Sequence, residues 1–87
     1  HPNIANSLNN LGNVYGSLGE YVRASEYHQQ ALAIQKQIYG DRPHPGVARS
    51  LNSLGDAYGS LGEYARASEY YKDALAIKKQ IYGDQPH

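Results

Sequence analysis

Residues 8–31 read LNNLGNVYGSLGEYVRASEYHQQA, and residues 51–74 return to the same pattern as LNSLGDAYGSLGEYARASEYYKDA. The second stretch begins 43 residues after the first, and only 12 positions differ when residues 1–43 are aligned with residues 44–86. A fixed period of this length is typical of arrays built from stacked structural repeats. We therefore predict a first repeat at 1–43, a second repeat at 44–86, and His87 as the first residue of a truncated third unit.

The first part of each repeat carries apolar residues at the spacing of an amphipathic helix. In the first repeat they follow one another in steps of four and three, which places them on one stripe that we expect to face the core. This stripe consists of Ile4, Leu8, Leu11, Tyr15 and Leu18. Gly19 can end the helix because glycine readily adopts a left-handed conformation. The pattern predicts helices at about residues 3–17 and 46–60.

A second helix follows in each repeat, at about residues 20–39 and 63–82. Its predicted core-facing stripe in the first repeat consists of Tyr21, Ala24, Tyr27 with His28, Ala31, Ile34 with Gln35, and Ile38. Gly40 is the expected C-cap, and Pro43 and Pro45 prevent this helix from running on into the next repeat. No strand pattern occurs in the sequence. The predicted fold is all-α, with four antiparallel helices joined by short loops.

A glycine in the middle of the first helix indicates a close helix contact. Gly12 costs about 1 kcal/mol relative to alanine at such a position. This cost is understandable if a neighbouring helix passes so near that a Cβ atom would clash. Ala24 and Ala31 are the corresponding small residues on the second helix. We therefore expect the two helices of a repeat to pack closely at Gly12.

These residues resemble the tetratricopeptide repeat, whose pattern is a large apolar residue, Leu-Gly, Tyr, Ala, an aromatic residue and Ala. The matching positions are Leu8, Leu11, Gly12, Tyr15, Ala24 and Ala31 in the first repeat, and Leu51, Leu54, Gly55, Tyr58, Ala67, Tyr71 and Ala74 in the second. Leu8 and Leu51 replace the usual tryptophan, and His28 replaces the aromatic residue. Lys36 and Lys79 stand where the family often has proline, so the unit is longer than the usual length of about 34 residues. Long units of this kind are similar to those of the kinesin light chain subclass.

The resemblance implies a right-handed superhelix of stacked helix pairs, with a concave groove that is lined by the first helix of each repeat and binds extended peptides. The matching groove positions are Asn6, Asn9, Asn10 and Asn13, followed by Arg49, Asn52, Ser53 and Asp56. An amide side chain offers both a donor and an acceptor, so it can pair with the backbone of a bound peptide. Alternatively, these residues are solvated polar groups on an exposed face. Several of them differ between the repeats, which would adjust ligand preference while the scaffold stays the same.

A second hypothesis from the sequence is structural self-association. Two repeats are fewer than the three or so that such arrays usually need for stability. The last helix keeps Ile77 and Ile81 on its apolar stripe, so we expect its end of the array to accept another repeat. Copies stacked head to tail in this way would close into rings or continue as filaments.

The composition argues against several other classes of function. The chain has 8 Lys or Arg residues and 8 Asp or Glu residues, and this balance argues against nucleic-acid and anionic-membrane partners. Lys36, Lys78 and Lys79 share their helices with acidic residues, so the sequence favours a mixed solvated surface over a basic patch. No apolar run approaches the roughly 20 residues that a membrane-spanning helix needs. Without a visible targeting signal, we expect a cytoplasmic location.

Catalysis, metal binding and cofactors are not expected from the sequence. His1, His44 and His87 each open a repeat and would lie at helix N-termini, too far apart to share a metal ion, and His28 stands alone. The chain has no cysteine. No nucleophile lies beside a base, and the Gly-Ser-Leu-Gly turns follow helices rather than the strand that a phosphate-binding loop requires. We therefore predict a binding protein and not an enzyme.

Overall fold

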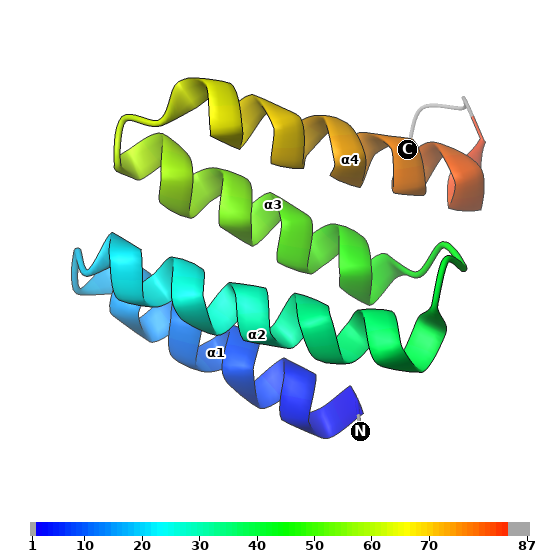
Figure 1. The fold of residues 1–87 in the computed structure, drawn as a ribbon, viewed down its shortest axis with the longest axis horizontal. Helices are drawn as coiled ribbons and strands as arrows, with labels where there is room; N and C mark the ends of the chain where they lie inside the picture. Colours follow the sequence, from blue (N-terminus) through cyan, green and yellow to red (C-terminus); the bar gives the residue numbers. More distant parts are fainter. Residues whose placement is uncertain (1, 84–87) are drawn as a thin grey trace.

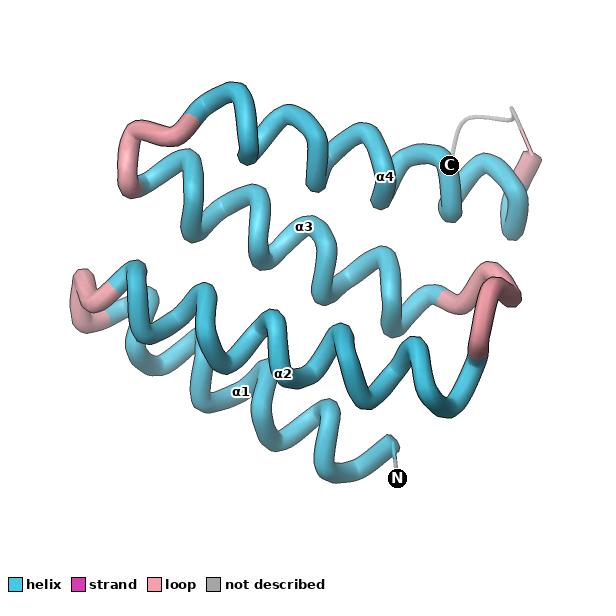
Figure 2. Tube along the Cα trace, viewed as in Figure 1, coloured by secondary structure: helices cyan, strands magenta, loops and turns pink. Residues whose placement is uncertain are grey.

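The computed structural model describes residues 2–83, which form four α-helices (Figure 1). These are α1 (Pro2–Ser17), α2 (Tyr21–Tyr39), α3 (Pro45–Ser60) and α4 (Tyr64–Tyr82). Each boundary lies within one residue of the predicted one, because the glycines and prolines that set the helix ends act locally. Within residues 2–83 there are only helices and loops (Figure 2), which confirms the predicted all-α fold.

The helices are arranged as two helix-turn-helix pairs in a row. Each helix runs antiparallel to the preceding one and packs against it (Figure 1). α3 lies between α2 and α4, whereas α1 packs on α2 and touches α3 over a short stretch only. The predicted stacking of two helical units is therefore confirmed.

A glycine ends the first helix of each pair. Gly19 has a left-handed φ of 80°, and its N–H donates to the carbonyl oxygen of Gly16 at 3.1 Å. The N–H of Glu20 donates to the carbonyl oxygen of Tyr15 at 2.9 Å. The same two hydrogen bonds recur around Gly62, whose φ is 82°. They satisfy carbonyl groups that a helix end would otherwise leave unpaired, and they turn the chain back toward the second helix.

The connection between the pairs is fixed by a histidine. His44 is the N-cap of α3, and its Nδ1 accepts a hydrogen bond from the backbone N–H of Gly46 at 2.9 Å. Its ring stacks on Tyr39 with the two ring centroids 3.8 Å apart. The predicted place of His44 at a helix N-terminus is thus confirmed, while His1 and His87 lie outside the described residues.

The hydrophobic core lies between α2, α3 and α4. Leu54 is fully buried and packs with Tyr58 and Ala67. A second cluster consists of Val47, Ala48, Leu51 and Ala74, with Leu32, Tyr39, Tyr70 and Ile77 packed against it. Most of the repeat-pattern residues of the second repeat are therefore core residues.

Three of the five residues of the predicted apolar stripe of α1 do not face the core, contrary to the prediction from the sequence. The exposed fractions of Ile4, Leu11 and Leu18 are 54%, 42% and 65%. Leu54, the counterpart of Leu11 in the second repeat, has an exposed fraction of 0%. The difference arises because α2 covers this side of α3, whereas no helix among the described residues covers the same side of α1.

α1 packs on α2 through a different stripe, which is built of small residues. Its members follow one another in steps of four, three and four, and they are Ala5, Asn9, Gly12 and Gly16. A Cβ atom on Gly12 would lie 2.6 Å from the His28 ring, and one on Gly55 would lie 2.6 Å from the Tyr71 ring. The close approach predicted at Gly12 is confirmed, and it recurs in the second repeat.

Candidate binding groove

A cavity of about 410 Å³ opens between α1, α2 and α3. We call it the groove cavity. Its polar lining includes three residues predicted for the groove, Asn13, Ser53 and Asp56. α2 contributes Tyr21 and His28, which the sequence analysis assigned to the core-facing stripe. The first helices of the two repeats, α1 and α3, therefore line one cavity together. The second helix of the first repeat, α2, contributes further lining residues.

A second cavity, of about 750 Å³, adjoins the first between α3 and α4. We call it the α4 cavity. Asp56 and Ser60 line both cavities, and the α4 side is formed by residues that include Tyr64, Lys72 and Leu75. Asp56 and Ser60 of α3 thus form a polar ridge between the groove cavity and the α4 cavity.

Asp56 is held at this ridge by Tyr71. The Tyr71 hydroxyl donates a hydrogen bond to the Asp56 carboxylate, which raises the pKa of Tyr71 to about 12. The carboxylate is thereby held on the side of α4 while its charge remains available to both cavities. Burial lowers the pKa of His28, and the negative charge of Asp56 opposes this lowering.

His28 lies under the groove cavity and carries its hydrogen on Nδ1. The Nδ1 atom lies 2.8 Å from Oδ1 of Asn9, and the Asn9 amide nitrogen donates to the Ser50 hydroxyl at 2.9 Å. Because the amide nitrogen is the donor to Ser50, Oδ1 accepts from His28. Burial lowers the pKa of His28, so the ring is neutral at neutral pH.

The comparison with protein families identifies the architecture. The model of the family described as Tetratricopeptide repeat matches residues 3–80. The chain belongs to the tetratricopeptide repeat family. This confirms the predicted resemblance, and tetratricopeptide repeats are in general protein-interaction modules.

A solved tetratricopeptide-like structure supports the same assignment. The crystal structure of BtubC (BKLC) from P. vanneervenii is similar to this chain with a TM-score of 0.82 and 28% sequence identity. The match covers 95% of this chain and 33% of that chain, so this chain spans about a third of its length. A comparison with curated proteins found no match.

Asn9 occupies a different place in the tetratricopeptide unit from the one predicted. Its exposed fraction is 6%, and both ends of its amide are hydrogen-bonded inside the protein. The Ser50 hydroxyl in turn donates to Oε1 of Gln35 at 2.6 Å. Asn9 lies on the α2-facing stripe, because it follows Ala5 by four residues and precedes Gly12 by three. We therefore remove Asn9 from the groove residues and regard it as the hub of a network that joins α1, α2 and α3.

The other predicted groove residues do not line either cavity of this tetratricopeptide chain. Asn6, Asn10 and Arg49 are exposed, and Asn52 is half-buried. The structure thus brings Asn13, Ser53 and Asp56 together and leaves these four outside. The sequence analysis missed the contribution of α2. The only signal is that the residues at these two positions, Tyr21 and His28, lie as far from Gly19 as Tyr64 and Tyr71 lie from Gly62.

No other type of site emerges from the described part of the tetratricopeptide chain. Within residues 2–83, no group of three or more His, Cys, Asp or Glu side chains could hold a metal ion. None of the helices in the same range is long and apolar enough to cross a membrane.

Proposed function

We propose that this tetratricopeptide chain binds an extended segment of a partner protein in the groove cavity. The observation that carries this proposal is that Asn13 on α1 and Ser53 and Asp56 on α3 line one hollow of about 410 Å³. An extended segment leaves its backbone N–H and C=O groups unpaired, and amide, hydroxyl and carboxylate side chains can pair with them. The proposal also agrees with the general role of tetratricopeptide repeats as protein-interaction modules.

The charged side chain in the groove cavity indicates which chemical groups the bound segment would carry. Among the lining residues, all of which lie in the described range, Asp56 is the only carboxylate, and no lysine or arginine is present. A ligand group that donates hydrogen bonds or carries positive charge would therefore be favoured opposite Asp56. Tyr21 supplies an aromatic surface beside it.

Peptides selected from a displayed random library against the immobilised chain would test this proposal. Their dissociation constants would be measured by fluorescence anisotropy. We expect Asn13→Ala and Asp56→Asn each to weaken binding by about tenfold, the effect of about 1.4 kcal/mol of lost hydrogen bonding or charge attraction. Asp56→Asn retains an oxygen that can accept from Tyr71, so the fold should be unaffected.

The matched control is Asn10→Ala, because Asn10 is exposed on the same helix but does not line the cavity. Its affinity should stay within about twofold of the unmodified chain. Peptides that bind all three variants equally well would place the binding site elsewhere on the molecule.

A second candidate function is stacking through the outer faces of α1 and α4. The contact between α2 and α3 shows how such a surface is covered: Leu54 of α3 is buried there, while its counterpart Leu11 on α1 is 42% exposed. Ile77, which the sequence places on this surface, packs instead against the core. Leu75 of α4 points outward, with an exposed fraction of 53%. Head-to-tail stacking of copies would cover both faces at once.

Solution mass measured by light scattering across a range of protein concentrations tests the stacking candidate. Mass should rise with concentration, and Leu11→Lys should prevent the rise because it places a charge at the position of buried Leu54. Ala33→Lys is the control, since Ala33 is an exposed residue of α2 outside both faces. A mass independent of concentration, or an equal rise in both variants, would exclude this function.

A further inference from the structure

The contact between α2 and α3 shows how one helix of this chain covers its neighbour. The same contact can be used to infer which helix would fit the outer face of α4. Gln35 of α2 has an exposed fraction of 4%, and its Oε1 accepts from the Ser50 hydroxyl of α3 at 2.6 Å. Gln29 of α2 donates from Nε2 to the Tyr58 hydroxyl of α3 at 2.7 Å. The polar part of this contact is therefore made by uncharged amides, and an apolar part is made by Leu32.

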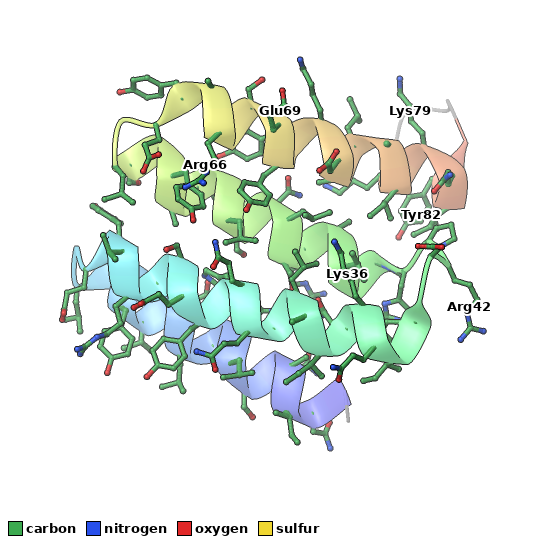
Figure 3. All side chains as sticks on the ribbon, in the orientation of Figure 1. Lys36, Arg42, Arg66, Glu69, Lys79 and Tyr82 are labelled. Atoms are coloured by element: carbon green, nitrogen blue, oxygen red, sulfur yellow. The ribbon has the colours of Figure 1, made fainter. Side chains whose placement is uncertain are left out.

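On α4 both amides are replaced by cations while the apolar residue is kept. Lys78 stands at the position of Gln35, Lys72 at that of Gln29, and Leu75 at that of Leu32. All three are exposed, and Lys72 and Leu75 line the α4 cavity together. Lys79 also belongs to α4 and points away from the other helices (Figure 3). We call Lys72, Leu75, Lys78 and Lys79 the α4 outer face.

The acidic residues of α4 belong to a different stripe. Glu69 and Asp73 correspond to Glu26 and Gln30 of α2, which are exposed although α3 covers the neighbouring stripe. A helix that covered α4 as α3 covers α2 would therefore leave Glu69 and Asp73 in solvent. It would meet Lys72 and Lys78, whose counterparts Gln29 and Gln35 bond to α3. At the position of Gln35 it would bury the Lys78 ammonium, which is costly unless an opposite charge pairs with it.

The first helix of a second copy does not supply that charge. α1 contains no charged side chain, and Ser7 stands where Ser50 stands on α3. A serine hydroxyl matches the amide of Gln35 but cannot neutralise a lysine, whereas a carboxylate at the same position could accept directly from its ammonium group. Because α4 has Lys78 where α2 has Gln35, the helix that fits α4 differs from the helix that fits α2.

We propose that the α4 outer face docks an amphipathic α-helix that carries an acidic residue at the position held by Ser50 on α3. Apolar residues of that helix cover Leu75 as Leu51 and Leu54 cover Leu32, and its carboxylate pairs with Lys78. This inference rests on the second candidate function, because it assumes that the outer face is covered in the manner of the α2–α3 contact. It implies that unmodified copies stack only weakly, since α1 offers no carboxylate to Lys78. It names the partner as an acidic helix rather than an unmodified second copy of the chain.

Placing the missing carboxylate on the chain itself tests the inference. Ser7→Asp gives α1 an acidic residue at the required position, and Ser7 is exposed, so the fold should be retained. Sedimentation equilibrium should show head-to-tail association at least about tenfold tighter than that of the unmodified chain, as expected for a charge-assisted hydrogen bond at a buried position. Ser7→Asn is the matched control because it has the same size as Asp without the charge, and it should give no such gain.

Two double variants separate the inference from the stacking function on which it rests. Ser7→Asp combined with Lys78→Gln should lose the gain, and Ser7→Asp combined with Leu11→Lys should lose association altogether. Equal association of the Asp and Asn variants, or a gain that survives Lys78→Gln, would overturn the acidic partner and leave stacking intact. Association that survives Leu11→Lys would overturn stacking through these faces as well.

Discussion

At the scale of single residues, the two glycines of α1 differ in what surrounds them. A Cβ atom on Gly12 would lie 2.6 Å from the ring of His28, which is itself buried and bound to Asn9. A Cβ atom on Gly16 would find its nearest neighbour, the Cβ of Ala24, at an ordinary 3.9 Å. The first glycine is therefore required by packing, and the second is not.

Alanine substitutions at these two glycines should have opposite effects. Gly12→Ala should lower the free energy of unfolding by about 1–3 kcal/mol, because the overpacking outweighs the better helix propensity of alanine. Gly16→Ala should raise it by up to about 1 kcal/mol, since only the propensity term remains. Urea denaturation of both variants measures the difference. A neutral Gly12→Ala variant would mean that the His28 ring can move aside at little cost.

At the scale of secondary-structure elements, a chain of buried polar side chains connects three helices. It runs from His28 of α2 through Asn9 of α1 and Ser50 of α3 back to Gln35 of α2. In the described residues, every buried side-chain nitrogen and oxygen has a hydrogen-bond partner. Such a network specifies the relative position of the helices, because a shifted helix would leave its members unpaired.

Protonation of His28 should weaken this network in acid. Burial lowers the pKa of His28 in the folded chain below the ordinary value of 6.5, which the unfolded chain retains. The unfolded state therefore binds the proton first as pH falls. The contribution of neutral His28 is complete above pH 6.5 and is lost as pH falls from there through the folded pKa, with a slope of at most about 1.4 kcal/mol per pH unit.

The measurement is the free energy of unfolding between pH 7.5 and pH 5 for the unmodified chain and for His28→Gln. The other titratable groups are present in both proteins, so the difference between the two curves reports the replacement of His28. The glutamine variant should show the shallower pH dependence. Parallel curves would show that His28 accepts a proton in the folded state as readily as in the unfolded state.

At the scale of the whole molecule, position in the row of helices decides how much an identical residue contributes. The molecule measures 35 × 29 × 20 Å, with α3 enclosed between α2 and α4 while α1 has one free side. Leu54 on α3 is 0% exposed, and Leu11 at the same place in the repeat is 42% exposed. The two leucines form a matched pair within one chain.

Removing these two side chains should therefore have very different consequences. Leu54→Ala should destabilise the fold by about 2–5 kcal/mol, because it leaves a cavity in the core. Leu11→Ala should cost less than about 1 kcal/mol, since much of that side chain is already in water. Thermal unfolding followed by circular dichroism compares them. Similar losses would indicate that the outer side of α1 is covered in solution.

The sequence by itself determined the number of helices, their ends to within one residue, the family, and the close contact at Gly12. These features depend on local signals: turn glycines, prolines and the helical period, which act over a few residues. Among the groove residues that the family resemblance implied, Asn13, Ser53 and Asp56 line one cavity.

Only the tertiary structure decided which of two equivalent residues is buried and which polar side chains are free. Leu11 and Leu54 occupy the same position in their repeats, yet α2 covers only the second of them. Asn9 shares the polar character of its neighbours, but its partner Ser50 lies 41 residues away. The physical reason is the same in both cases: burial and hydrogen bonding depend on the helix that packs alongside, and that helix belongs to another part of the chain.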